Sequence, residues 1–236
     1  MSTGTILVSG MVAGVPGQGG ASWAVLQYLL GLRRLGHEVV LVEPVTVAPG
    51  VALERSPAAT YGAEVMRSFG LDGSWALLPT GSTETVGLAY EDLRAAARRA
   101  DILLNVSGML TDGALLEPVP VRAYLDLDPA FNQLWHEVER IDMRFDGHTH
   151  FATVGLSLGR PECPIPTCGY DWIHTCQPTA LDHWPVANRV VYDGLTTVAN
   201  WRGYGSIHHD GTHYGQKAHS LRPLMDLPTR SNEPFI

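Results

Sequence analysis

The stretch TILVSGMVAGVPGQGGASWAVLQYLLGLRRLGHEVVLVEP, residues 5–44, decides the fold. Residues 5–9 are short, apolar and rich in strand-forming side chains, and a glycine-rich loop follows them. Residues 21–35 then carry apolar side chains at helical spacing, and residues 38–42 form a second apolar run that ends at Glu43. A strand, a glycine loop, a helix and a second strand predict the βαβ opening of a parallel α/β sheet.

The same alternation continues along the chain. Helical spacing predicts helices over residues 60–69, 90–99 and 129–138, and apolar runs predict strands over residues 75–78, 101–106, 121–127 and 151–158. After about residue 160 the sequence is rich in proline and has little periodicity, until a β-like run over residues 195–200. We therefore expect a Rossmann-like parallel sheet with flanking helices over residues 1–160. A linker over residues 161–194 and the start of an incomplete second domain over residues 195–236 would follow.

Composition excludes several classes of protein. The chain has 236 residues with a net charge of −8, and its Lys and Arg residues do not cluster, which argues against binding nucleic acid or an anionic membrane surface. No apolar stretch is long enough to span a bilayer, and the start of the sequence does not resemble a signal peptide. Three cysteines, an odd number, suit reduced thiols. We expect a cytoplasmic protein.

The glycine loop is the first candidate site. Gly17, Gly19 and Gly20, with Ser22 on the first turn of the predicted helix, could shape a pocket for a substrate, and Glu43 could hold a ribose hydroxyl. The dinucleotide pattern G-x-G-x-x-G is not met, because Ser22 stands where the third glycine would be. A flexible strand-to-helix turn without a ligand explains the same residues.

Asp126 and Asp128 form the second candidate site. If the strand extends through both, their carboxylates point the same way and could bind a substrate or a divalent metal ion. Asp128 could instead help to start a helix, since Pro129 follows it directly. Both interpretations place the two residues at the carboxyl end of a strand, where open α/β sheets bind ligands.

The histidines and cysteines leave three interpretations open. His148 and His150 could ligate a metal ion, but the sequence does not fix a third ligand, and the spacing of the cysteines matches no zinc pattern. Because imidazole titrates near neutral pH, His150 could instead be the general base that deprotonates a hydroxyl group. A structural role is the third interpretation for each histidine.

Several segments together resemble a family of bacterial GT-B-type glycosyltransferases. The resemblance covers nearly the whole chain and is carried by residues 17–23, 36–44, 124–129, 133–135, 164–169, 196–205 and 214–217. It implies two Rossmann-like domains that face each other across a cleft, the first for the acceptor and the second for the nucleotide sugar. The chain departs from the family in having too few residues for the second domain.

The resemblance implies a metal-independent transfer of a sugar from a nucleotide-sugar donor to a small-molecule or glycan acceptor, with no other cofactor. His150 or Asp128 would be the catalytic base, and Gly17, Gly19, Gly20, Ser22, Glu43 and Asp126 would lie at the substrate. Two alternatives stay open. The βαβ unit with Glu43 also fits an NAD-linked oxidoreductase, and a chain without a donor half also fits a non-catalytic binding module.

Overall fold

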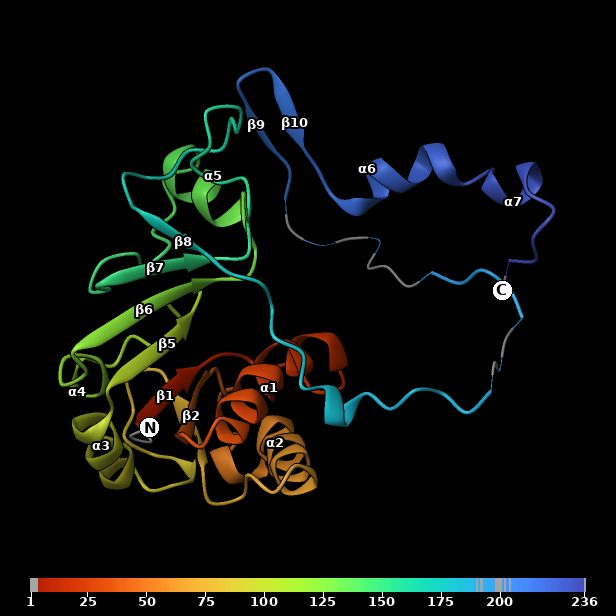
Figure 1. Ribbon diagram of the computed structural model, residues 1–236. Helices are drawn as coiled ribbons and strands as arrows, with labels where there is room; N and C mark the ends of the chain where they lie inside the picture. Colours follow the sequence, from red (N-terminus) through yellow and green to blue (C-terminus); the bar gives the residue numbers. More distant parts are fainter. Residues whose placement is uncertain are drawn as a thin grey trace.

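The computed structural model of the protein describes residues 4–189, 191, 193–197, 201, 203 and 205–235. Its centre is an eight-stranded sheet in the order β4-β3-β2-β1-β5-β6-β7-β8 (Figure 1). The strands are β1 (Thr5–Ser9), β2 (Glu38–Val45), β3 (Trp75–Pro79), β4 (Val86–Gly87), β5 (Ile102–Val106), β6 (Val121–Asp126), β7 (His150–Thr153) and β8 (Trp172–His174). Among these strands β4 alone pairs antiparallel with its neighbour. The predicted α/β fold with a mostly parallel sheet is confirmed.

Helices cover both faces of the sheet. One face packs against α1 (Gly19–Arg34) and α2 (Pro57–Ser68), next to the short 3-10 helix η1 (Leu53–Arg55), and the other packs against α3 (Tyr90–Arg99) and α4 (Gly113–Leu116). Because strand side chains alternate, Val8 lies in the core under α1 while Leu7 lies in the core under α3. Burial on both faces explains why the first strands read as continuous apolar runs.

The far half of the sheet is held by an aromatic cluster. Tyr124 on β6 packs edge-on against Phe145, and Phe151 on β7 stacks on Tyr170 with ring centroids 4.0 Å apart. Trp172 on β8 joins the same cluster, and Phe145 packs against His136 of the short helix α5 (Phe131–Glu137). The sheet therefore continues to β8, past residue 160 where we expected the first domain to end.

After β8 the chain crosses back to α1. The backbone N–H of Ala180 donates to Gln27 Oε1 at 2.5 Å, and the Trp184 ring lies 4.7 Å from the Trp23 ring. Arg34 on α1 pairs with Asp182 in the 3-10 helix η2 (Leu181–His183) at 2.6 Å, although both side chains are exposed. Residues 175–187, which we call the strap, therefore run from β8 at one edge of the sheet back to helix α1 (Figure 1).

The last segment is a hairpin followed by short helices. It consists of β9 (Ile207–His209), β10 (Thr212–Tyr214), α6 (Lys217–Leu221), η3 (Arg222–Leu224) and α7 (Leu227–Arg230). The hairpin lies beside α5 at the top of the molecule (Figure 1), and Ile207 in β9 and Ala218 in α6 are buried. None of the helices that the structure describes is long and apolar enough to cross a membrane.

Several predicted boundaries differ from those in the structure. Strand β7 ends at Thr153 instead of residue 158, and the helix expected over residues 129–138 covers only Phe131–Glu137. The run expected as a strand over residues 195–200 contains an isolated bridge at Leu195, while residues 198–200 lie outside the described residues.

Candidate functional site

A cavity opens at the carboxyl ends of β1 and β5, the two central strands. The chain builds β2 and β3 on one side of β1 and then crosses to build β5 on the other, so this is the topological switch point of the sheet. The cavity has a volume of about 820 Å³, within the roughly 300–1,000 Å³ of small-molecule sites. It is lined by Met11, Gln18, Ala21, Ala24, Val25, Val106, Ser107, Met109, Leu127, Asp128, Phe131, Gly203, Gly215, Gln216 and Lys217.

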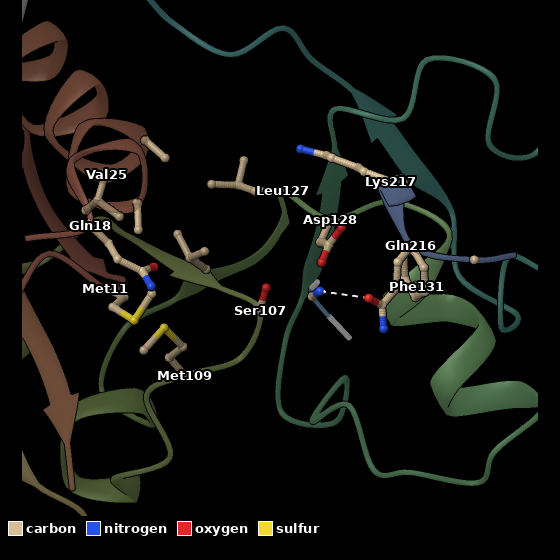
Figure 2. Close-up of a pocket in the computed structure, with 15 residues that line it drawn as sticks. Met11, Gln18, Val25, Ser107, Met109, Leu127, Asp128, Phe131, Gln216 and Lys217 are labelled. Carbon is tan, nitrogen blue, oxygen red and sulfur yellow. Dashed lines mark hydrogen bonds between the residues drawn. The ribbon is translucent and has the colours of Figure 1, made fainter. Parts of the chain in front are cut away.

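Distant parts of the sequence meet around this cavity (Figure 2). The loop after β1 and the first turns of α1 form one side, and the loop after β5 contributes Ser107. Asp128, just past β6, lies on the other side together with Gln216 and Lys217 from the C-terminal segment. Gln216 is held in place because its Oε1 accepts a hydrogen bond from the backbone of Gly203 at 3.2 Å. Lys217 is the only lysine in the sequence.

The two aspartates of the predicted pair have different surroundings. We expected both carboxylates on one face of a strand. Strand β6 ends at Asp126, however, so Asp128 lies outside the strand. Asp126 is fully buried, and its oxygens accept hydrogen bonds from the Asp128 backbone and from the side chains of Asn132, Gln133 and Thr153 at 2.7–3.0 Å. Asp128 is half-buried and lines the cavity. Asp126 therefore supports the loop that presents Asp128.

The carboxylate of Glu43 is hydrogen-bonded to the backbone of the glycine loop. Its side chain is fully buried at the end of β2, and its carboxylate accepts hydrogen bonds from the backbone N–H groups of Ala13 and Gly14 at 2.6–2.9 Å. Burial raises the pKa of Glu43, and the hydrogen bonds from the loop act in the opposite direction. A Cβ atom on Gly14 would lie 3.1 Å from Oε1 of that carboxylate, so a larger residue there would crowd it. Because the Glu43 side chain is fully buried beneath this loop, a ribose hydroxyl could reach its carboxylate only if the loop moved away.

The other residues predicted to bind substrate in this loop, three glycines and Ser22, have different positions. Gly17, Gly19 and Gly20 are exposed, with Gly19 and Gly20 in the first turn of α1 between Gln18 and Ala21, which line the cavity. Ser22 is buried, and its hydroxyl donates to the carbonyl oxygen of Val12 at 2.7 Å. The glycines thus border the pocket, while Ser22 fastens the loop to the helix.

The structure separates His150 from Asp128. His150 is the first residue of β7 and is exposed, whereas the cavity lies at the carboxyl ends of the parallel strands. Its Nδ1 lies 2.9 Å from the hydroxyl of the neighbouring Thr149. Of the two predicted catalytic residues, Asp128 alone lines the cavity.

His148 has a structural position instead. Its Nδ1 lies 3.1 Å from the carbonyl oxygen of Phe145, and its Nε2 lies 3.0 Å from the amide nitrogen of Asn105. A neutral ring with its proton on Nδ1 satisfies both contacts, because Nε2 then accepts from Asn105. Burial lowers the pKa of His148, which favours this neutral form.

We expect His148 to make the fold sensitive to acid. Its pKa is lowered on folding, so the unfolded chain binds the proton more readily, and stability is lost as the pH falls below the ordinary value of about 6.5. In urea unfolding between pH 7.5 and pH 5, His148→Gln should flatten the dependence of the unfolding free energy on pH. An unaltered slope in His148→Gln would refute the assignment.

A turn after β5, missed by the sequence analysis, forms the floor of the cavity. Ser107 and Gly108 have φ values of 49° and 62°, and the N–H of Met109 donates to the carbonyl oxygen of Val106 at 3.0 Å. Two central residues with positive φ are typical of a type I′ turn, which favours Asn or Gly over Ser at the first position. Residues held in this region cluster at functional sites. In the sequence, the Ser107-Gly108 pair after the apolar run of β5 was the signal that could have predicted this turn.

Contacts of Asn105 and of the loop that carries Arg144 stabilise this turn. Asn105 is fully buried, and its side chain exchanges two 3.0 Å hydrogen bonds with the backbone of Leu110. A side chain on Gly108 would lie 2.9 Å from Arg144 Cβ, so the loop that carries Arg144 packs directly on the turn. These contacts hold the turn in place and position Ser107 at the pocket.

Strain at Ser107 predicts opposite results for two small substitutions. Ser107→Gly removes the side chain that disfavours positive φ and should raise the free energy of unfolding by about 0.5–1 kcal/mol, after allowing for the greater freedom of glycine in the unfolded chain. Ser107→Ala keeps the unfavourable backbone and should give no gain. Urea unfolding of both variants tests this, and equal stabilities would show that the turn is unstrained.

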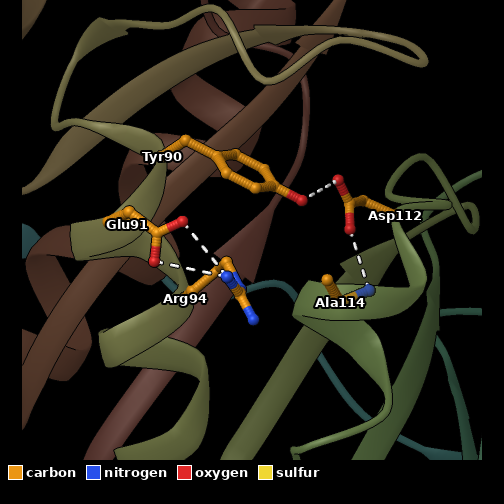
Figure 3. Close-up of polar contacts among 5 residues, drawn as sticks. All are labelled: Tyr90, Glu91, Arg94, Asp112 and Ala114. Atoms are coloured by element: carbon orange, nitrogen blue, oxygen red, sulfur yellow. Dashed lines mark hydrogen bonds and ion pairs between the residues drawn. The ribbon is translucent and has the colours of Figure 1, made fainter.

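The same loop is fastened at its other end (Figure 3). The hydroxyl of Tyr90, the first residue of α3, donates to Asp112 Oδ2 at 2.7 Å, and the backbone N–H of Ala114 donates to Asp112 Oδ1 at 2.9 Å. Asp112 thus caps α4 and joins it to α3. Burial, together with the hydrogen bond to Asp112, raises the pKa of Tyr90. The loop from Ser107 to Asp112 is consequently fixed at both ends.

The described residues contain no group of three His, Cys, Asp or Glu side chains placed to hold a metal ion. Cys163, Cys168 and Cys176 are free thiols. His208 and His213 face each other across the β9–β10 hairpin, with Nε2 and Nδ1 2.9 Å apart. These histidines fix the hairpin that leads into Gln216 and Lys217.

No protein-family model matches the chain, and no curated protein matches its sequence.

Proposed function

We propose that the chain is the acceptor half of a GT-B-type glycosyltransferase and that the switch-point pocket binds the hydroxyl group that receives the sugar. The observation that carries the proposal is the half-buried Asp128 carboxylate, which lines an 820 Å³ cavity at the carboxyl edge of the sheet. The resemblance to GT-B enzymes supplies the reaction. The three free thiols suit a reducing compartment, and we infer the cytoplasm.

Asp128 would act as the general base. Its carboxylate takes the proton of the acceptor hydroxyl as the acceptor oxygen bonds to the anomeric carbon of the donor sugar. The bond from that carbon to the diphosphate breaks, and the nucleoside diphosphate leaves with the electron pair. The proton on Asp128 then passes to solvent, so the carboxylate is regenerated.

The C-terminal segment fits the beginning of a second α/β unit. Leu195 and Phe235 form a parallel β-bridge, in which the Leu195 N–H donates to the carbonyl oxygen of Pro234 at 2.8 Å. Parallel pairing needs a long crossover, and the hairpin with α6 and α7 supplies one here. We infer that residues 195–236 start the donor-binding domain, which would place Gln216 and Lys217 between the two ligands.

Transfer assays test the proposal. The chain as it stands, and a version extended by a donor domain in the same reading frame, would be incubated with a panel of nucleotide sugars and hydroxyl acceptors, and products would be detected by mass spectrometry. A glycosylated acceptor from the extended protein supports the proposal. Failure of every donor with the extended, folded protein would reject it.

The burial of Glu43 and its hydrogen bonds to the glycine loop count against an NAD-linked oxidoreductase. In a dinucleotide-binding fold the acidic residue after the second strand must be available to the ribose, whereas Glu43 is buried and bonded to its own loop. Titration with NADH, followed by its fluorescence, should show no binding at millimolar cofactor.

A further inference from the structure

The two sides of the pocket have different chemistry. The side formed by α1 and the loops after β1 and β5 presents Met11, Met109, Val25 and two alanines, with Gln18 at its edge. The opposite side presents Asp128, Gln216 and Lys217 beside the ring of Phe131 (Figure 2). A ligand that fills the cavity therefore meets mainly apolar atoms on one side and most of the polar groups on the other.

This asymmetry limits the kind of acceptor that fits. A sugar carries hydroxyl groups around its whole ring, and those turned toward thioether and aliphatic side chains would lose water without gaining a partner. An aromatic or aliphatic body gains from the same contacts, and the flexible methionines can adapt to its shape. Met11 and Met109 are both half-buried and line the same side of the pocket (Figure 2).

We propose that the acceptor is amphipathic, with an apolar body on the Met11–Met109 side and its reacting hydroxyl group at Asp128. Ser107, on the loop after β5, also lines the pocket and lies between Met109 and Asp128 in the view of Figure 2. The assignment of the reacting hydroxyl depends on the proposed function, whereas the binding of an apolar body does not.

Binding without any donor tests the ligand class. The probes are 4-methylumbelliferone, an aromatic alcohol, and methyl β-glucoside, a polar one, and affinities would be measured by titration calorimetry. We expect the aromatic probe to bind at least about tenfold more tightly than the glucoside. Tighter or equal binding of the glucoside would overturn the proposal.

Two substitutions of one residue locate the binding site. Met109→Gln keeps the length of the side chain but makes it polar, and should weaken binding of the aromatic probe about tenfold. Met109→Leu keeps the apolar character and should change it less than about twofold. Circular dichroism would show that both variants are folded, and equal effects of the two substitutions would overturn the proposal.

The outcomes separate the ligand class from the reaction. If the aromatic probe binds in a Met109-dependent way and no donor sugar is transferred to it or to any other alcohol, the proposed function fails and the ligand class stands. If the glucoside is glycosylated while the aromatic probe neither binds nor reacts, the ligand class fails and the proposed function stands.

Discussion

Replacing Asp126 by alanine is expected to lower the free energy of unfolding by about 3–5 kcal/mol. The side chain is fully buried and accepts hydrogen bonds from four donors, those of Asp128, Asn132, Gln133 and Thr153. Without the carboxylate these buried donors lose their partner, and each unsatisfied group costs free energy. Urea denaturation followed by circular dichroism measures the change.

Asparagine at the same position separates charge from hydrogen bonding. An amide turns an NH₂ group toward donors that need an acceptor, so Asp126→Asn should also destabilise the fold, by about 2 kcal/mol. Asp171→Ala removes an exposed carboxylate as a control and should cost less than about 0.5 kcal/mol. A loss below 1 kcal/mol for Asp126→Ala would show that the network does not support the loop.

Asp128→Asn is expected to reduce glycosyl transfer at least 100-fold, at the low end of the roughly 10²–10⁴ contributed by a general base. The amide cannot take a proton from the acceptor, but it has nearly the shape of the carboxylate, so the pocket and the KM for the acceptor should change little. Because Asp128 is only half-buried, the free energy of unfolding should stay within about 1 kcal/mol of that of the natural protein.

His150 supplies the matched comparison for this experiment. Its position at the amino end of β7 predicts that His150→Gln transfers sugar at close to the original rate. The measurement is kcat for both variants with the extended protein that carries a donor domain. Full activity in Asp128→Asn, or a large loss in His150→Gln, would move the base away from the pocket.

The sheet was predictable because its signals are local. A buried parallel strand reads as an apolar run, and helices such as residues 90–99 carry acidic residues in the first turn and basic residues in the last. The hairpin at Asp210-Gly211 was missed even though Asp-Gly favours a type I′ turn, because its strands have three residues each and lack a clear alternating pattern.

The site was predicted only in part because it is assembled from distant segments. The glycine loop and Asp128 were recognisable since both follow strands, where α/β sheets bind ligands. The sequence does not show that the carboxylates of Glu43 and Asp126 accept hydrogen bonds within the protein. Their donors are backbone amides and side chains of loops, and the course of these loops is set by packing. Gln216 and Lys217 reach the pocket only after the chain has crossed α1 and returned.

The solitary lysine at the pocket has a practical consequence for anyone handling the protein. Lys217 is the only lysine in this sequence and lines the cavity, so coupling to a biosensor surface through primary amines would attach many molecules through the wall of the cavity. Such a surface would under-report binding. The same property makes site-selective labelling possible without any mutation, since a fluorophore on Lys217 would sit at the edge of the cavity and report directly on its occupancy.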